Sequence, residues 1–133
     1  MKKIGRLLLI LIGLFMINIS LVKADTEKNL VNIYLFHSDT CPHCKEEIKL
    51  LNKLEKEYDN IRIYKYEINT DNNGELLLNV ANLFDTNVTG TPFTVIGDKV
   101  YKGFSYENSK SKFIRTIEYY SDNGYKDRVG EYI

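Results

Sequence analysis

The chain has 133 residues, of which 44% are hydrophobic and 27% are charged, and its 18 basic and 18 acidic side chains give a formal net charge of zero. This length suits one globular domain and leaves little room for a second. The balanced charge argues against a nucleic-acid-binding protein, which needs a basic face.

The first 24 residues have the pattern of an export signal. A short basic start precedes an apolar run over residues 7–22, and Ala24 provides the small residue that a signal peptidase requires before its cut. We therefore predict a signal peptide over residues 1–24 that is cleaved after Ala24. An uncleaved membrane anchor formed by residues 4–22 stays open as the alternative, although the run is slightly short for a spanning helix.

Both interpretations of the leader place the rest of the chain, residues 25–133, outside the cytoplasm as a secreted or cell-envelope domain. The leader carries four bases and no acid, so 14 bases face 18 acids in the remaining chain, for a net charge of about −4. An acidic domain makes a nucleic-acid partner still less compatible with the sequence.

Residues 31–37 are almost continuously apolar and predict a strand that is buried on both faces. The polar Ser38-Asp39-Thr40 segment ends this strand and is predicted to cap a helix over residues 41–58. The apolar stripe of that helix consists of Cys44, Ile48, Leu51, Leu54 and Tyr58, and its charged face is interpreted as solvated.

A second strand is predicted over residues 61–68, followed by a loop over residues 69–73. Asn72 and Glu75 have the spacing of a capping box, which predicts a helix that ends at Phe84 or Asp85.

Two β-like runs, 93–96 and 99–104, flank Gly97-Asp98 and predict a tight antiparallel hairpin. Ser105 is predicted to cap a last helix that ends at Asn123-Gly124, and residues 125–133 are left unassigned.

This order of elements predicts an α/β fold. The strand–helix–strand start requires a right-handed crossover and a parallel strand pair. The closing hairpin then gives a mixed four-stranded sheet in the order β-α-β-α-β-β-α, flanked by helices.

The chain has two cysteines, Cys41 and Cys44, and they lie where the first predicted helix begins. As a structural disulfide they would close almost no loop and would stabilise little. A helix N-terminus instead favours a thiolate at Cys41, which is the reactive form of the side chain. We predict that Cys41 forms a mixed disulfide with a partner and that Cys44 resolves it, with no cofactor beyond the redox-active Cys41–Cys44 disulfide.

Two further residues complete the tetrad. Pro42 occupies an early helical position, where its missing N–H has no helical partner. His43 lies beside Cys41, and we predict that it lowers the Cys41 pKa, stabilises the reduced form and makes the disulfide a better oxidant. A surface histidine without a role is the alternative interpretation.

A second motif, Gly90-Thr91-Pro92, directly precedes the predicted hairpin. Proline is permitted at the first residue of a strand. A cis bond before Pro92 would turn the Thr91 backbone toward the cysteines, where it could pair with an extended substrate chain. An ordinary trans proline that ends a loop is the other possibility.

The Cys-Pro-His-Cys tetrad after a buried strand and the Gly-Thr-Pro motif before a hairpin together resemble the thioredoxin superfamily, over about residues 29–120. The tetrad itself is similar to that of the bacterial disulfide oxidases. The resemblance implies a thiol–disulfide oxidoreductase whose Thr91–Pro92 bond is cis and lies against Cys41. Its implied partners are cysteine-containing exported proteins and a redox partner, free or membrane-bound, that recharges the pair.

The sequence departs from this family in three respects. Thr40 replaces the usual tryptophan of thioredoxins. Leu35 replaces a buried acid that moves protons for the second cysteine, so proton transfer to Cys44 is expected to use water or another group. Residues 69–88 have room for one helix only, which excludes the inserted helical domain of disulfide oxidases and predicts the minimal, glutaredoxin-like form of the fold.

Two other functions stay open at this stage. The first is a non-catalytic zinc- or copper-binding module using Cys41, Cys44, His43 and His37, although His43 is badly placed between two helical cysteines for a tetrahedral site. The second is a reductase of exported thiols in place of an oxidase. An isomerase normally needs dimerisation or a second domain, and we expect a monomer.

Overall fold

A computed structural model describes residues 3–6 and 26–133 of the chain. Most of the predicted leader and its cleavage point after Ala24 lie outside the described residues. Within the described part, no helix combines the length and the apolar character needed to cross a membrane.

A mixed sheet forms the centre of the domain. Its strands are β1 (Val31–His37), β2 (Ile61–Glu67), β3 (Phe93–Ile96) and β4 (Lys99–Lys102). They lie in the order β2-β1-β3-β4, with β1 parallel to β2 and β3 antiparallel to both β1 and β4. The predicted four-stranded mixed sheet is therefore confirmed, with the apolar β1 at its interior as expected for a strand buried on both faces.

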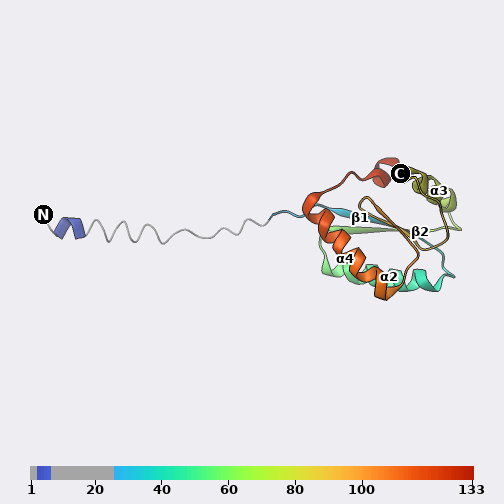
Figure 1. The fold of residues 1–133 in the computed structure, drawn as a ribbon, viewed down its shortest axis with the longest axis horizontal. Coiled ribbons are helices and arrows are strands. Elements are labelled where there is room, and N and C mark those ends of the chain that lie inside the picture. The colour runs from blue at the N-terminus through green and yellow to red at the C-terminus, as the bar shows by residue number, and fades with distance from the viewer. Residues whose placement is uncertain (1–2, 7–25) are drawn as a thin grey trace.

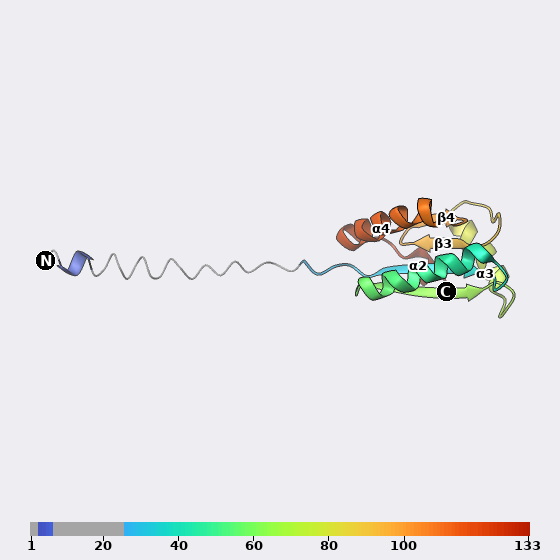
Figure 2. The ribbon, with the colours of Figure 1, turned by 90° about the horizontal axis from the view of Figure 1, so that it is seen from below.

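Helices cover both faces of the sheet. They are α2 (Pro42–Glu57), α3 (Asn73–Leu83), α4 (Tyr106–Asn123) and α5 (Arg128–Tyr132). α2 and α4 contact each other on one face, while α3 and α5 contact each other on the opposite face (Figure 1). A view turned by 90° shows α2 and α4 in one layer, with their axes running roughly along the strands (Figure 2).

The alternation of side chains along β1 divides the core into two clusters. Ile33 and Leu35 pack with the apolar side chains of α2 and α4, including Leu51. Tyr34 and Phe36 point the other way and pack with α3 and α5. Because successive side chains of a strand point to opposite faces, one continuous apolar strand can join both layers.

The structure corrects two predictions about helix ends and adds one helix that was not predicted. Asn72 precedes α3 in a left-handed conformation and its side chain makes no capping hydrogen bond, so the predicted capping box is absent. Ser105 precedes α4 as predicted, but its side chain also makes no capping bond. Residues 125–133, which had no assignment, contain α5, whose first turn is capped when the Asp127 carboxylate accepts a hydrogen bond from the Gly130 N–H.

Candidate functional site

The first cysteine marks the start of α2. Cys41 is the residue before the first helical residue, and its Sγ accepts a hydrogen bond from the Cys44 N–H at 3.2 Å. A sulfur at this position takes the role that Ser, Thr or Asp usually plays in satisfying an unpaired amide of the first turn. The helix was predicted to be capped by the Ser38-Asp39-Thr40 segment, but Cys41 forms the cap.

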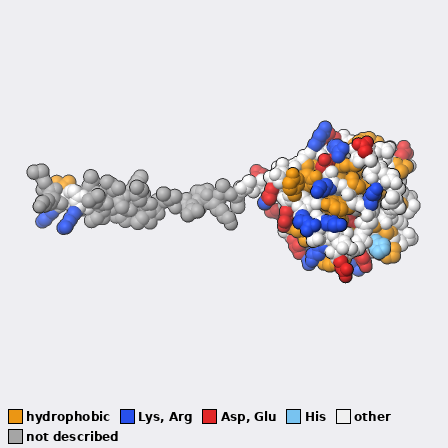
Figure 3. All heavy atoms as spheres, viewed as in Figure 1, with side chains coloured by type: hydrophobic (Ala, Val, Ile, Leu, Met, Phe, Trp, Pro, Cys, Tyr) orange, Lys and Arg blue, Asp and Glu red, His pale blue; other side chains and the backbone are white. Residues whose placement is uncertain are grey.

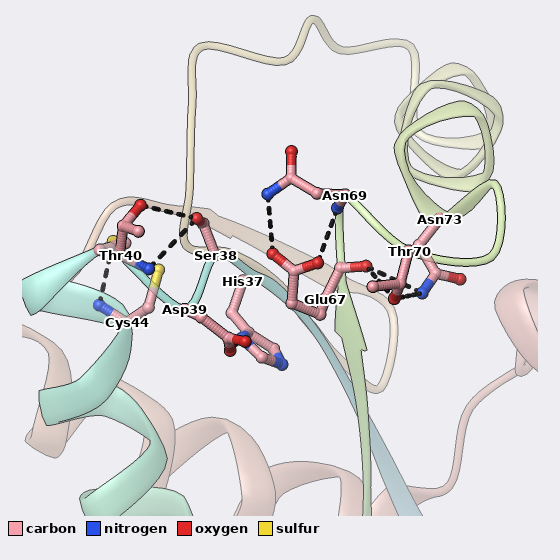
Figure 4. A network of polar contacts seen from close by, with 10 residues as sticks. His37, Ser38, Asp39, Thr40, Cys44, Glu67, Asn69, Thr70 and Asn73 are labelled. Atoms are coloured by element: carbon pink, nitrogen blue, oxygen red, sulfur yellow. Dashed lines mark hydrogen bonds and ion pairs between the residues drawn. The ribbon is translucent and has the colours of Figure 1, made fainter.

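The preceding residues shape the turn that delivers Cys41 to the helix. The Ser38 and Thr40 hydroxyls lie 3.1 Å apart, and the Cys41 N–H donates to the Ser38 carbonyl at 3.1 Å. Figure 4 shows Ser38, Thr40 and Cys44 together at the end of β1, with His37 beside Asp39. The local bonds fix the backbone immediately before the reactive sulfur.

The two thiols occupy different environments. Both cysteines are free thiols; Cys41 is partly exposed, whereas Cys44 is completely buried. Burial acts to raise the pKa of Cys41, but hydrogen bonds with Cys44, Thr91 and the His43 backbone lower that pKa below its usual value. Burial and the hydrogen bond with Cys41 raise the pKa of Cys44 to about 11. Near neutral pH the accessible sulfur is thus the more acidic one, as a nucleophile requires.

The second sequence motif reaches the same place from β3. The Thr91–Pro92 peptide bond is cis, and the Cys41 thiol donates to the Thr91 carbonyl oxygen at 3.6 Å. Pro92 is buried, and its carbonyl accepts a hydrogen bond from the Gly103 N–H at 2.8 Å. Thr91, partly exposed, lies beside Cys41 although 50 residues separate them in the sequence.

The remaining residues of interest lie around this pair. Pro42 opens α2, and both Pro42 and His43 are exposed to solvent. The His37 Nδ1 lies 3.7 Å from an Asp39 carboxylate oxygen. Within residues 3–6 and 26–133, no three His, Cys, Asp or Glu side chains gather closely enough to hold a metal ion. The four ligands considered for a metal module are therefore not assembled into a site.

One residue near the cysteines, Glu47, was not predicted from the sequence. It was not assigned to the buried stripe of α2, yet its side chain is 0% exposed. One carboxylate oxygen, Oε1, accepts a hydrogen bond from the Thr94 hydroxyl, and the other, Oε2, is buried without a partner. Burial raises the pKa of Glu47 to about 7, against the lowering effect of Thr94.

A helical projection would have indicated this burial. Glu47 lies three residues after Cys44 and four before Leu51, so it falls on the same side of α2 as both.

Comparison with solved structures gives the fold. Thioredoxin O1 of Arabidopsis thaliana in its oxidized state has 18% sequence identity and a TM-score of 0.50, over 65% of this chain and 78% of that chain. Thioredoxin O2 of the same plant, also oxidized, has 16% identity and a TM-score of 0.50, over 65% and 75%. These similarities agree with the strand order and helix layers described above.

The chain has the thioredoxin fold. This confirms the fold expected from the two sequence motifs. A glutaredoxin of Archaeoglobus fulgidus is also similar, with 21% identity and a TM-score of 0.47, over 62% of this chain and 85% of that chain. No protein-family model and no curated protein sequence matches the chain.

The thioredoxin fold of this chain also carries a groove away from the cysteines. It has a volume of about 1090 Å³ and lies between β4, α4 and the end of α3. Its lining includes Lys99, Lys112 and Arg115 beside Tyr101, and Figure 3 shows Lys and Arg side chains among hydrophobic ones on one face of the domain. Neither cysteine nor Thr91–Pro92 lines this groove, so the groove is separate from the cysteine pair.

Proposed function

We propose that the chain is an exported thiol–disulfide oxidoreductase that acts on protein cysteines through Cys41 and Cys44. The observation that carries this proposal is the unequal pair: a partly exposed sulfur with a lowered pKa caps a helix, and a buried thiol with a raised pKa follows one turn later. A structural pair would not need one accessible, acidic sulfur.

The cycle follows from this arrangement. The Cys41 thiolate attacks one sulfur of a partner disulfide, and the partner's other sulfur leaves as a thiolate. Cys44 then loses its proton and attacks the Cys41 sulfur, so that the Cys41–Cys44 disulfide forms and the second partner sulfur leaves. Two electrons pass from the pair to the partner, and the same steps in reverse oxidise a partner dithiol.

The hydrogen bonds to Cys41 favour the oxidase direction. They stabilise the thiolate, hence the reduced form of the pair, and a stabilised reduced form makes the disulfide a stronger oxidant. The partners we propose are exported proteins with cysteines, together with a separate redox protein, free or membrane-bound, that restores the pair. The Thr91 backbone beside Cys41 is where we propose that an extended substrate segment lies.

Trapping in the host tests the function. The full chain carrying Cys44→Ala retains the attacking sulfur but cannot resolve the mixed disulfide, so we expect it to accumulate covalently on exported cysteine-containing proteins. The double variant Cys41→Ala/Cys44→Ala is the matched control and should trap none. The proposal is wrong if the purified wild-type protein exchanges with no protein disulfide and Cys41 titrates as an ordinary thiol.

Equilibration of the wild-type pair with glutathione tests the direction. A reduction potential of about −120 mV would identify an oxidant, and a potential of about −270 mV would identify a reductant. Mass measurement of the protein recovered from the host tests export, because cleavage after Ala24 removes residues 1–24.

A further inference from the structure

The buried thiol of Cys44 needs a group that removes its proton. Cys44 is 0% exposed and its pKa is raised to about 11, so at neutral pH it is almost wholly protonated. A protonated thiol is a poor nucleophile. The resolving step of the proposed cycle would therefore be slow unless a base accepts the proton as the sulfur attacks.

Glu47 is the ionisable group that the fold places on the buried side of α2 next to Cys44. Residues three apart on a helix are neighbours, with about 5–6 Å between their Cβ atoms. Cys44 and Glu47 are both 0% exposed and both belong to the buried side of α2, and Glu47 reaches Thr94 on β3. Among the described residues, Glu47 is the one fully buried acid.

The sheet holds the Glu47 carboxyl at a defined position. Thr94 on β3 donates to Oε1, and Thr94 is the register partner of Leu35 on β1. The Glu47 carboxyl thus reaches the sheet beside Leu35, the position where the resemblance to thioredoxins would place a buried acid. Oε2 is buried without a hydrogen-bond partner, although a buried carboxylate oxygen ordinarily has one. Oε1 is therefore held by Thr94, whereas Oε2 has no partner and is able to take up and release a proton.

Burial, not a charged neighbour, governs the acidity of this carboxyl. On the α2 side of the sheet, the charged or titratable side chains are His37 on β1, Lys65 and Glu67 on β2, and Lys99 and Tyr101 on β4. The Tyr101 hydroxyl bonds to Thr116 on α4. Lys65 bonds to Asn52, and Glu67 to Asn69 (Figure 4), so neither side chain pairs with Glu47. A carboxyl titrating near neutral pH is ionised in enough molecules to accept a proton, and basic enough to do so.

We infer that the Glu47 carboxylate accepts the Cys44 thiol proton when Cys44 attacks the mixed disulfide on Cys41. The Cys44 S–H bond breaks and the proton moves to Glu47 Oε2. The Cys44–Cys41 bond forms, and the partner sulfur leaves as a thiolate. In the reverse direction Glu47 returns the proton to Cys44, so this role holds for an oxidase and a reductase alike. The inference rests on the proposed function.

The two steps can be measured separately with an aromatic disulfide such as Ellman's reagent. Attack by Cys41 releases the first thionitrobenzoate, and resolution by Cys44 releases the second. Glu47→Gln keeps the side-chain volume and an acceptor for Thr94 but cannot take up a proton. We expect the first release to be unchanged, and the second to slow by about 100-fold at neutral pH, the usual effect of losing a positioned base.

A pH profile separates proton transfer from a structural role. In the wild type, the rate of the second release should rise with pH through an inflection near 7, as Glu47 ionises. In Glu47→Gln that inflection should disappear and the rate should rise only toward the Cys44 pKa of about 11. Thr94→Val removes the bond that lowers the Glu47 pKa, so the inflection should move to higher pH.

Glu46→Gln is the matched control, because Glu46 is the exposed neighbour on the same helix and the charge change is identical. It should leave both releases and the inflection unaltered. The inference is overturned if Glu47→Gln resolves within about twofold of the wild type, or retains the inflection near 7. Absence of the first release would instead contradict the proposed function, so the two failures are distinguishable.

Discussion

At the scale of single residues, the opposite pKa shifts of the two cysteines assign their order of reaction. Burial acts to raise the pKa of Cys41, but hydrogen bonds lower that pKa below its usual value. Burial raises the pKa of Cys44. As pH falls through the Cys41 pKa, the thiolate is lost and attack slows. Cys44 stays protonated across this range, so alkylation of the reduced protein at neutral pH should modify Cys41 first.

His43 provides a residue-scale prediction. Its backbone lowers the pKa of Cys41 through a hydrogen bond, while its ring is exposed. His43→Pro removes both the N–H donor and the ring, so the Cys41 pKa should rise. His43→Ala keeps the donor and should give a smaller rise. Ultraviolet thiolate absorbance against pH measures both, with melting curves as the check on folding.

An equal Cys41 pKa in wild type and His43→Pro would refute any tuning by this residue. An equal rise in the two variants would assign the whole effect to the imidazole ring and none to the backbone.

At the scale of elements, the hairpin between β3 and β4 depends on Gly97. Its φ is +60°, and a Cβ at this position would lie 2.3 Å from a ring carbon of Tyr120. Gly103 has a comparable φ of +77°, but a Cβ there would meet nothing within 4 Å. The two glycines share a conformation that disfavours other residues and differ in the space around them.

Gly97→Ala should therefore destabilise the domain by about 3 kcal/mol, through backbone strain together with overpacking against Tyr120. Gly103→Ala should cost about 1 kcal/mol, because it introduces the strain alone. Urea unfolding of both variants measures the difference. Equal losses would show that the Tyr120 ring moves aside without cost.

The regular elements followed from the sequence where apolar spacing was long enough to be unambiguous. The run at β1 and the stripe of α2 predicted both elements closely, and the Gly97-Asp98 pair predicted the hairpin. α5 has only five residues and too few turns to show a period, so its assignment depended on long-range contacts. Glu47 was missed for a different reason: its charge suggested solvent exposure, although its helical spacing places it beside Cys44 and Leu51. Its partner Thr94 is known only from the packed sheet.

At the scale of the whole molecule, hydrogen bonds join the C-terminal segment, residues 125–133, to the interior strand β1. Asp127 Oδ2 accepts hydrogen bonds from the Tyr34 hydroxyl at 2.8 Å and the Asn32 side-chain amide at 2.6 Å. Val129, 0% exposed, joins the core cluster on the α3 face. The segment that had no predicted structure thus closes one face of the sheet.

Asp127→Ala should destabilise the fold by about 3 kcal/mol, because it removes a charged acceptor and leaves the Tyr34 hydroxyl and Asn32 amide without their partner. Glu131→Ala, which removes an exposed ion pair with Lys126 in the same segment, should cost under about 0.5 kcal/mol. Both are measured by urea unfolding.

Thiol exchange at Cys41 should stay at the wild-type rate in both folded variants, because α2 lies on the opposite face of the sheet from α5. A comparable loss in the two variants would mean that the C-terminal segment is held by Val129 packing and not by Asp127.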